Sequence, residues 1–237
     1  MTITESTTVA AIASMLPSSV RVLQRYGIDF CCGGKRPLAD VCTDQGLSVP
    51  DLTAAIEASA AAPSGEDPDW KSEPLHSLVD HIVTTFHDRL RADLPHLEAM
   101  ASKASQAHVS KAPYFTRLHD VIAELSADLH DHMQKEERVL FPAICALERG
   151  ERRHARWIQQ PITVMEQEHE HAGELLAELR RMTHQYAIPE WACSTVRALH
   201  QGLEELEASM HIHVHLENNV LFPRTQILAE RAARAGA

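Results

Sequence analysis

A histidine–glutamate pattern occurs twice in this chain and restricts its fold more than any other feature. His132-Met-Gln-Lys-Glu136-Glu-Arg-Val-Leu-Phe-Pro corresponds to His213-Val-His-Leu-Glu217-Asn-Asn-Val-Leu-Phe-Pro, at an offset of 213 − 132 = 81 residues. A histidine and a glutamate four positions apart project from the same face of a helix. Each copy therefore predicts a helix that presents an imidazole and a carboxylate side by side.

Four long stretches of the chain show helical periodicity without the alternation of strands. In the first stretch, Leu75, Leu78, Ile82 and Phe86 belong to one apolar stripe at helical spacing. Each stretch begins near a proline, which a first helical turn tolerates. The predicted helices cover residues 74–103, 113–147, 161–185 and 189–233. We therefore expect an all-α chain whose main part is an antiparallel four-helix bundle.

The first and third of these helices repeat more weakly than the second and fourth. His87 and His169 are 169 − 87 = 82 residues apart, and an acidic residue follows each of them. The bundle is therefore expected to consist of two related helix pairs with a pseudo-twofold axis between them.

Helical phase separates a few inward histidines from the total of 16. A lone His-x-x-x-Glu pair is more often an ordinary exposed pair, but His132 and Glu136 continue the apolar stripe of Leu129 and Val139. Buried carboxylates are costly without a positive partner, and inward Glu and His side chains on four helices are a known way to build a dimetal site. The predicted metal ligands are His87, His132, Glu136, His169, His213 and Glu217.

The remaining histidines are expected at the surface or behind the ligands. His211 and His215 share a helix face with acidic residues and are predicted to point outward. Asp128 and Glu168 are candidates for groups that support the ligands. Four imidazoles and two bridging carboxylates leave both metals open to oxo, hydroxo or diatomic ligands, which favours non-haem iron over structural zinc.

Composition excludes several classes of function. The formal net charge of −11 disfavours a nucleic-acid surface. No apolar run reaches the length of a membrane span, and no basic residue precedes Val9–Leu16 as a secretory signal would require. With 5 cysteines, an odd number, a disulfide framework is disfavoured. We expect a cytoplasmic protein without a membrane segment.

A short module precedes the bundle. Residues 61–69 are small, acidic or turn-forming and resemble a linker, so we expect a front domain over 1–62, a linker over 63–73 and the bundle over 74–233. The front domain is predicted to contain short helices, one ending at Gly27 and one near Gly46.

A loop of this front module contains Cys31 and Cys32, followed by Gly33 and Gly34. The two thiols are either small buried side chains or a thiolate site for transient iron, nitrosyl or partner exchange. Adjacent cysteines do not easily form an unstrained disulfide with each other. We take Cys31 and Cys32 as the candidates for a chemical role.

These motifs together resemble a known family. The loop Asp29-Phe30-Cys31-Cys32-Gly33-Gly34 is similar to that of the ScdA-type N-terminal domain, and the repeated His-x-x-x-Glu-x-x-x-Leu-Phe-Pro stretches are similar to a hemerythrin-like domain. Their combination resembles the iron-sulfur cluster repair di-iron (RIC) proteins. The resemblance implies an oxo- or hydroxo-bridged di-iron centre held by the six ligands named above, in a protein that responds to nitric oxide or oxidative stress.

Three functions follow as hypotheses. The first is an iron donor to damaged iron-sulfur proteins, which would be its clients. The second is a nitric-oxide binder or scavenger, which would be an enzyme only if it reduces the gas. The third is a sensor of oxygen or redox state. The front module could also mediate a homodimer, and no nucleic acid is expected as a partner.

Overall fold

The computed structural model describes residues 3–31, 33–61 and 68–234. These residues form helices joined by turns, with one isolated antiparallel bridge between Thr8 and Pro37. The predicted all-α class is confirmed. Contacts divide the chain into two compact units: one holds the residues up to Pro74 together with His211–Arg224, and the other holds Leu75–Met210 together with the residues from Thr225 onward. The domain boundaries expected from the sequence stay a prediction.

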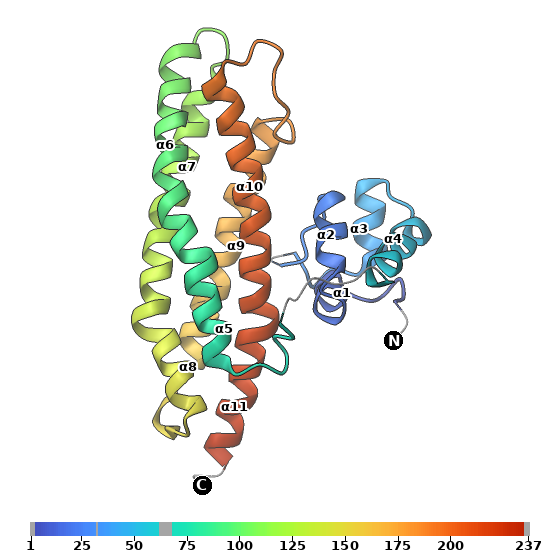
Figure 1. Ribbon diagram of the computed structural model, residues 1–237, viewed down its shortest axis with the longest axis vertical. Helices are drawn as coiled ribbons and strands as arrows, with labels where there is room; N and C mark the ends of the chain where they lie inside the picture. Colours follow the sequence, from blue (N-terminus) through green and yellow to red (C-terminus); the bar gives the residue numbers. More distant parts are fainter. Residues whose placement is uncertain (1–2, 32, 62–67, 235–237) are drawn as a thin grey trace. The chain divides into compact units, whose positions relative to one another are not determined.

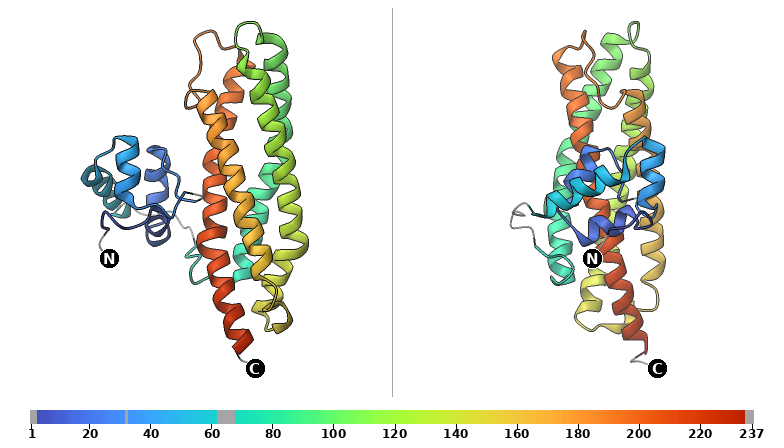
Figure 2. Two further views of the ribbon diagram at one scale, coloured as in Figure 1. Left: turned by 180° about the vertical axis from the view of Figure 1, so that it is seen from behind. Right: turned by 90° about the vertical axis from the view of Figure 1, so that its right-hand side faces the viewer.

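Four long helical rods run side by side with alternating directions (Figures 1 and 2). In chain order they consist of α5 (Leu75–Ile82), η1 (Val83–His87) and α6 (Asp88–His108); α7 (Tyr114–Lys135), η2 (Glu136–Leu140) and α8 (Phe141–Glu148); α9 (Gln159–Met182); and α10 (Ser194–Leu216), η4 (Glu217–Leu221) and α11 (Phe222–Arg234). Each rod covers most of one predicted helix.

The ends of two rods differ from the sequence prediction. The third stops at Met182, because the backbone of His184, Gln185 and Tyr186 is left-handed, with φ of 50°, 63° and 59°. An α-helix cannot continue through that conformation. The fourth begins at Ser194 rather than near residue 189.

The bundle is held by apolar side chains that face inward at helical spacing. In α7, the fully buried set includes Phe115, Leu118, Ile122 and Leu125. Burial of one such side chain stabilises a fold by about 1.5–3 kcal/mol. No helix in the described part of the chain is both long enough and apolar enough to cross a membrane.

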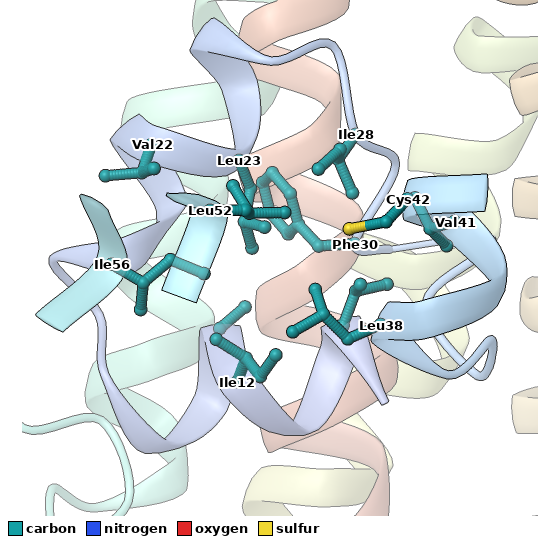
Figure 3. Packing of buried hydrophobic residues seen from close by; sticks show 12 residues of the cluster. Ile12, Val22, Leu23, Ile28, Phe30, Leu38, Val41, Cys42, Leu52 and Ile56 are labelled. Carbon is teal, nitrogen blue, oxygen red and sulfur yellow. The ribbon is translucent and has the colours of Figure 1, made fainter. Parts of the chain in front are cut away.

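The front helices are α1 (Val9–Met15), α2 (Ser19–Arg25), α3 (Leu38–Gln45) and α4 (Val49–Ala61). Figure 3 shows their shared core, in which side chains from all four helices and from the loop between α2 and α3 meet around Phe30. The helix end predicted at Gly46 is confirmed, since Gly46 caps α3 with φ of 66°. The helix α1 was not predicted from the sequence.

Candidate metal centre

Three of the predicted ligands stand at π-helical turns. His87 ends η1, Glu136 begins η2 and Glu217 begins η4. In η2 and η4 the turn closes when the amide of Phe141 or Phe222 donates to the carbonyl of the glutamate five residues earlier. A proline follows each phenylalanine. Proline has no amide hydrogen to donate, and its ring collides with the carbonyl four residues earlier, which disfavours a regular α-helix there. The repeated Phe-Pro pair therefore favours two of the three turns, although Pro95 inside the regular helix α6 shows that proline alone does not produce one. Nothing in the sequence explains η1.

All six predicted ligands are buried within the fold. His87, Glu136 and Glu217 have no exposed surface, and none of the other three exceeds 3%. They come from every rod, so no single helix contributes more than one histidine and one glutamate.

The ligand atoms gather into two groups that share both carboxylates. One group consists of His87, Glu136, His213 and Glu217, and the other of His132, Glu136, His169 and Glu217; within each, the donor atoms lie within 4.8 Å of one another. Two cations held in this way would be bridged by Glu136 and Glu217. The structure thus brings together all six residues, whereas their role as ligands stays a prediction.

The spacing of the donor atoms suits a coordination sphere. The Nε2 atoms of His132 and His169 are 3.1 Å apart, and Nε2 of His213 is 3.1 Å from Oε1 of Glu217. Oε2 of Glu136 lies 3.4 Å from Nε2 of His87 and 3.3 Å from Nε2 of His132. Two donors that each lie about 2.1 Å from one ion, at right angles, are about 3 Å apart. The residues present therefore fit a pair of metal ions.

Two glutamates hold the rings of the first two histidines. Nδ1 of His132 donates to Oε2 of Glu168 at 2.9 Å, and Lys135 also donates to Glu168. These hydrogen bonds, first that of His132, lower the pKa of Glu168 to about 2. Carboxylates behind metal-bound histidines fix the tautomer and orientation of the ring.

Glu137 plays the same part for His87, whose Nδ1 donates to it at 2.7 Å. Burial alone would raise the pKa of Glu137, but its hydrogen bonds with His87 and Arg91 outweigh that effect and lower it. Glu137 therefore stays an acceptor at neutral pH.

These supports leave a lone pair on each opposite ring nitrogen. When Nδ1 of a neutral imidazole carries the proton, Nε2 is an acceptor. In His87 and His132 that acceptor lies 3.4 and 3.3 Å from Oε2 of Glu136. A cation between nitrogen and carboxylate would be attracted by both, which supports the metal-binding interpretation.

The structure corrects part of the sequence interpretation. Glu168 supports a ligand as expected, but Asp128 lies exposed and faces His171 at 3.4 Å. Val139 is 49% exposed, because the π-turn that begins at Glu136 changes the helical phase assumed for the stripe. Glu137 was missed, since its position one residue after a ligand suggested no contact with His87.

The histidines predicted to point outward are also partly corrected. His211 is half-buried, and His215 is buried with a pKa that desolvation lowers to about 4. Both rings contact the edge of Phe30, at centroid distances of 5.8 and 5.5 Å. Their partner, Phe30, lies in the loop between α2 and α3, which sequence periodicity within one helix does not reveal.

Of the two candidate cysteines, Cys31 is buried and Cys32 lies outside the described residues. The structure does not bring Cys31 into either group of buried metal ligands. Among the described residues, Cys31, Cys42, Cys145 and Cys193 form no disulfide.

Comparison with known proteins gives two family matches. Residues 78–225 match the family described as "Hemerythrin HHE cation binding domain", and residues 5–60 match the ScdA_N family, described as a domain of unknown function. The chain is also 38% identical, over 213 residues, to proteins named iron-sulfur cluster repair protein YtfE from Pectobacterium carotovorum, Shigella boydii and Escherichia coli O1:K1. Each alignment covers 90% of this chain and 93% of the relative.

The resemblance inferred from the two motifs is confirmed by these matches. The hemerythrin match includes all six predicted ligands, and the ScdA_N match includes the cysteine loop. The cation-binding character of the bundle agrees with its buried histidine and glutamate groups. This chain belongs to the hemerythrin HHE cation-binding family and to the family of the iron-sulfur cluster repair proteins named YtfE.

Proposed function

We propose that this protein holds two non-haem iron ions in its bundle and takes part in the repair of damaged iron-sulfur clusters, with iron-sulfur proteins as its clients. The observation that carries the proposal is the pair of buried ligand groups that share Glu136 and Glu217. The name of the relatives, iron-sulfur cluster repair protein, supports a role in cluster repair.

The donor set supports iron in particular. Imidazole nitrogen and carboxylate oxygen suit iron, zinc and manganese, and neither buried group contains a thiol. Each group offers four protein donors, which is fewer than the six that iron commonly accepts. When bound, the iron ions would supply redox chemistry and open coordination positions.

The chain's own residues would hold this centre and keep it accessible to exchange. Glu137 and Glu168 orient His87 and His132, and the buried rods exclude bulk water from the ligands. Iron would leave the protein as cargo when protons or client ligands replace the metal on these side chains. Donation of iron to a client is the mechanism we favour for repair.

Metal analysis with Mössbauer spectroscopy on the purified protein tests the centre. We expect two coupled irons per chain, and a zinc-filled centre would contradict the proposal. Repair is tested with a client whose cluster nitric oxide has damaged. Iron-loaded protein should restore client activity, whereas a Glu136→Ala variant should not. Equal restoration by metal-free protein with the same amount of free iron would contradict donation.

Binding of nitric oxide is a second candidate, and the four-donor groups favour it because they leave positions open to a diatomic ligand. Anaerobic stopped-flow spectroscopy of the reduced protein should show iron-nitrosyl bands. Their absence would eliminate this function, and repeated production of nitrous oxide would make the protein an enzyme. A homodimer through the front module and a cytoplasmic location stay predictions.

A further inference from the structure

A second cluster of side chains that could bind a metal shares no residue with the histidine–glutamate centre. A carboxylate oxygen of Asp29, Sγ of Cys31 and a ring nitrogen of His211 lie within 4.8 Å of one another. All three belong to the same compact unit of the chain. Cys31 is buried, while Asp29 and His211 are half-buried, so the group is partly accessible to solvent.

The loop holds Asp29 and Cys31 in a fixed relation. Oδ1 of Asp29 accepts from the amide of Cys31 at 2.8 Å and lies 3.1 Å from its Sγ. Oδ2 accepts from the amide of Gly33, also at 2.8 Å. The carboxylate is therefore tied to the loop backbone and needs little reordering to accept a further partner.

The glycines after the cysteines make this arrangement possible. A Cβ on Gly34 would lie 2.4 Å from the carbonyl oxygen of Phe30, and one on Gly33 would lie 3.0 Å from Oδ2 of Asp29. Real Cβ atoms do not approach backbone so closely, so any side chain at residue 34 would displace the loop. The Cys-Cys-Gly-Gly sequence thus serves to bring a thiol against a carboxylate.

The third side chain comes from helix α10. The ring of His211 packs edge-on against Phe30, the residue directly before Cys31. Residues two apart on a helix point about 200° away from each other. His211 therefore faces away from the direction of His213, and the same helix supplies a histidine to each of two separate groups.

We propose that Asp29, Cys31 and His211 form a second, mononuclear site for a divalent transition-metal ion, Fe²⁺ in the cell. Thiolate, imidazole and carboxylate together suit ions of borderline softness such as Fe²⁺, Co²⁺ and Zn²⁺. Three protein ligands with an open fourth position are the arrangement of exchangeable rather than closed sites.

Binding at this site requires no oxidant or reductant. The Sγ–H bond of Cys31 breaks, its proton passes to solvent, and the thiolate forms a bond to the ion. The thiolate of Cys31 and the carboxylate of Asp29 would repel each other, and the positive ion between them removes this repulsion. The proposal goes beyond the proposed function, because it does not require iron in the bundle.

Titration of the metal-free full chain with Co²⁺ tests the site. A thiolate ligand gives a sulfur-to-cobalt charge-transfer band, and the buried bundle groups cannot produce it because they contain no cysteine. The titration is done on a Cys193→Ser background, because Cys193 is an exposed thiol with His108 Nε2 at 3.5 Å and could bind cobalt itself. We expect one cobalt per chain to give the band.

Three variants on that background assign the ligands. Cys31→Ser should abolish the band, and His211→Ala should weaken cobalt binding by about tenfold or more while leaving the loop's hydrogen bonds in place. The matched controls Cys32→Ser and Cys145→Ser should retain the band. Retention of the band in Cys31→Ser, its loss in Cys32→Ser, or unchanged affinity in His211→Ala would each overturn the proposal.

A Glu136→Ala variant separates this proposal from the proposed function. It should lose iron from the bundle and yet retain the charge-transfer band, because Glu136 does not belong to the Asp29, Cys31 and His211 group. Loss of the band in this variant, with an unchanged far-ultraviolet spectrum, would show that the thiolate site is not independent.

Discussion

The two halves of the bundle carry the same candidate metal ligands but differ in the residues at the positions behind them. Behind the histidines of the first half, Nδ1 of His87 donates to Glu137, and Nδ1 of His132 donates to Glu168 of α9 in the second half. The repeat maps residue 137 to 137 + 81 = 218, which is Asn218, and residue 168 to 168 − 82 = 86, which is Phe86. Neither equivalent position carries a carboxylate.

Each of the two candidate ligand groups contains one histidine that a glutamate supports. One ligand group combines His87 with His213, and the other combines His132 with His169. Each group therefore contains one histidine from each half, and a glutamate holds the histidine of the first half. In each group, at least one ring is thus oriented by a carboxylate.

The largest effect is expected at the shared glutamates, where the two halves should behave alike. Glu136→Ala and Glu217→Ala each remove a carboxylate from both ligand groups, so each variant should lose nearly all of its iron. His169→Ala, which touches one group only, is the control and should retain part of it. Iron content by elemental analysis is the measurement, and a large difference between the two glutamate variants would break the comparison.

The supporting carboxylates should show the asymmetry directly. Glu168→Gln keeps the shape of the side chain but removes the charge that holds His132, and we expect metal affinity to fall by about 10–100-fold. Glu137→Gln should act similarly through His87. Competition with a chelator measures both.

Asn218→Ala is the matched substitution in the second half and should change metal affinity by less than about threefold, since asparagine supplies no charge to a ligand. A loss as large as that of Glu168→Gln would show that the second half has a support of equal strength.

Adding a carboxylate to the second half tests the same difference between the halves in the opposite direction. Asn218→Glu places a carboxylate at the position equivalent to Glu137, and we expect metal to bind up to about tenfold more tightly. Gln201→Glu adds the same charge at an exposed position of α10 outside the ligand groups and serves as the control. Weaker binding in Asn218→Glu would indicate that the repeat does not extend to these side chains.

The smallest effect is expected at the prolines behind the π-turns. Pro142→Ala and Pro223→Ala restore an amide that can donate to the carbonyl four residues earlier, which favours a regular α-helix over the π-turn. We expect iron affinity to fall by a factor of about two to five, because the glutamate that opens each turn would be reoriented. The same chelator competition measures it, and a change in one variant alone would separate the two turns.

The bundle and its six buried histidines and glutamates could be predicted because their signals are local and repeated. An apolar stripe at helical spacing defines each rod, and the His-x-x-x-Glu pairs need only the geometry of one helix. The supporting groups were harder, because Glu137 meets His87 across two helices, 137 − 87 = 50 residues apart in the sequence. The exposure of Val139 was mispredicted because periodicity assumes one helical repeat throughout.

The cysteine loop shows the same limit more strongly. The loop itself was recognisable from its glycines, but the partner His211 lies 211 − 31 = 180 residues after Cys31. Nothing in the helix around His211 marks it as different from a surface histidine. Contacts between modules depend on the fold of the whole chain, which the pattern within one helix does not contain.

The positions of the π-turns in the two copies of the repeat bear on how the chain arose by duplication. Relative to an α-helix, a π-turn holds one additional residue, so it is a single-residue insertion that the helix has absorbed. In both copies of the repeat the turn begins at the shared glutamate, at Glu136–Leu140 and Glu217–Leu221. A single insertion in an ancestral helix pair, followed by duplication of the pair, accounts for both with fewer events than two separate insertions.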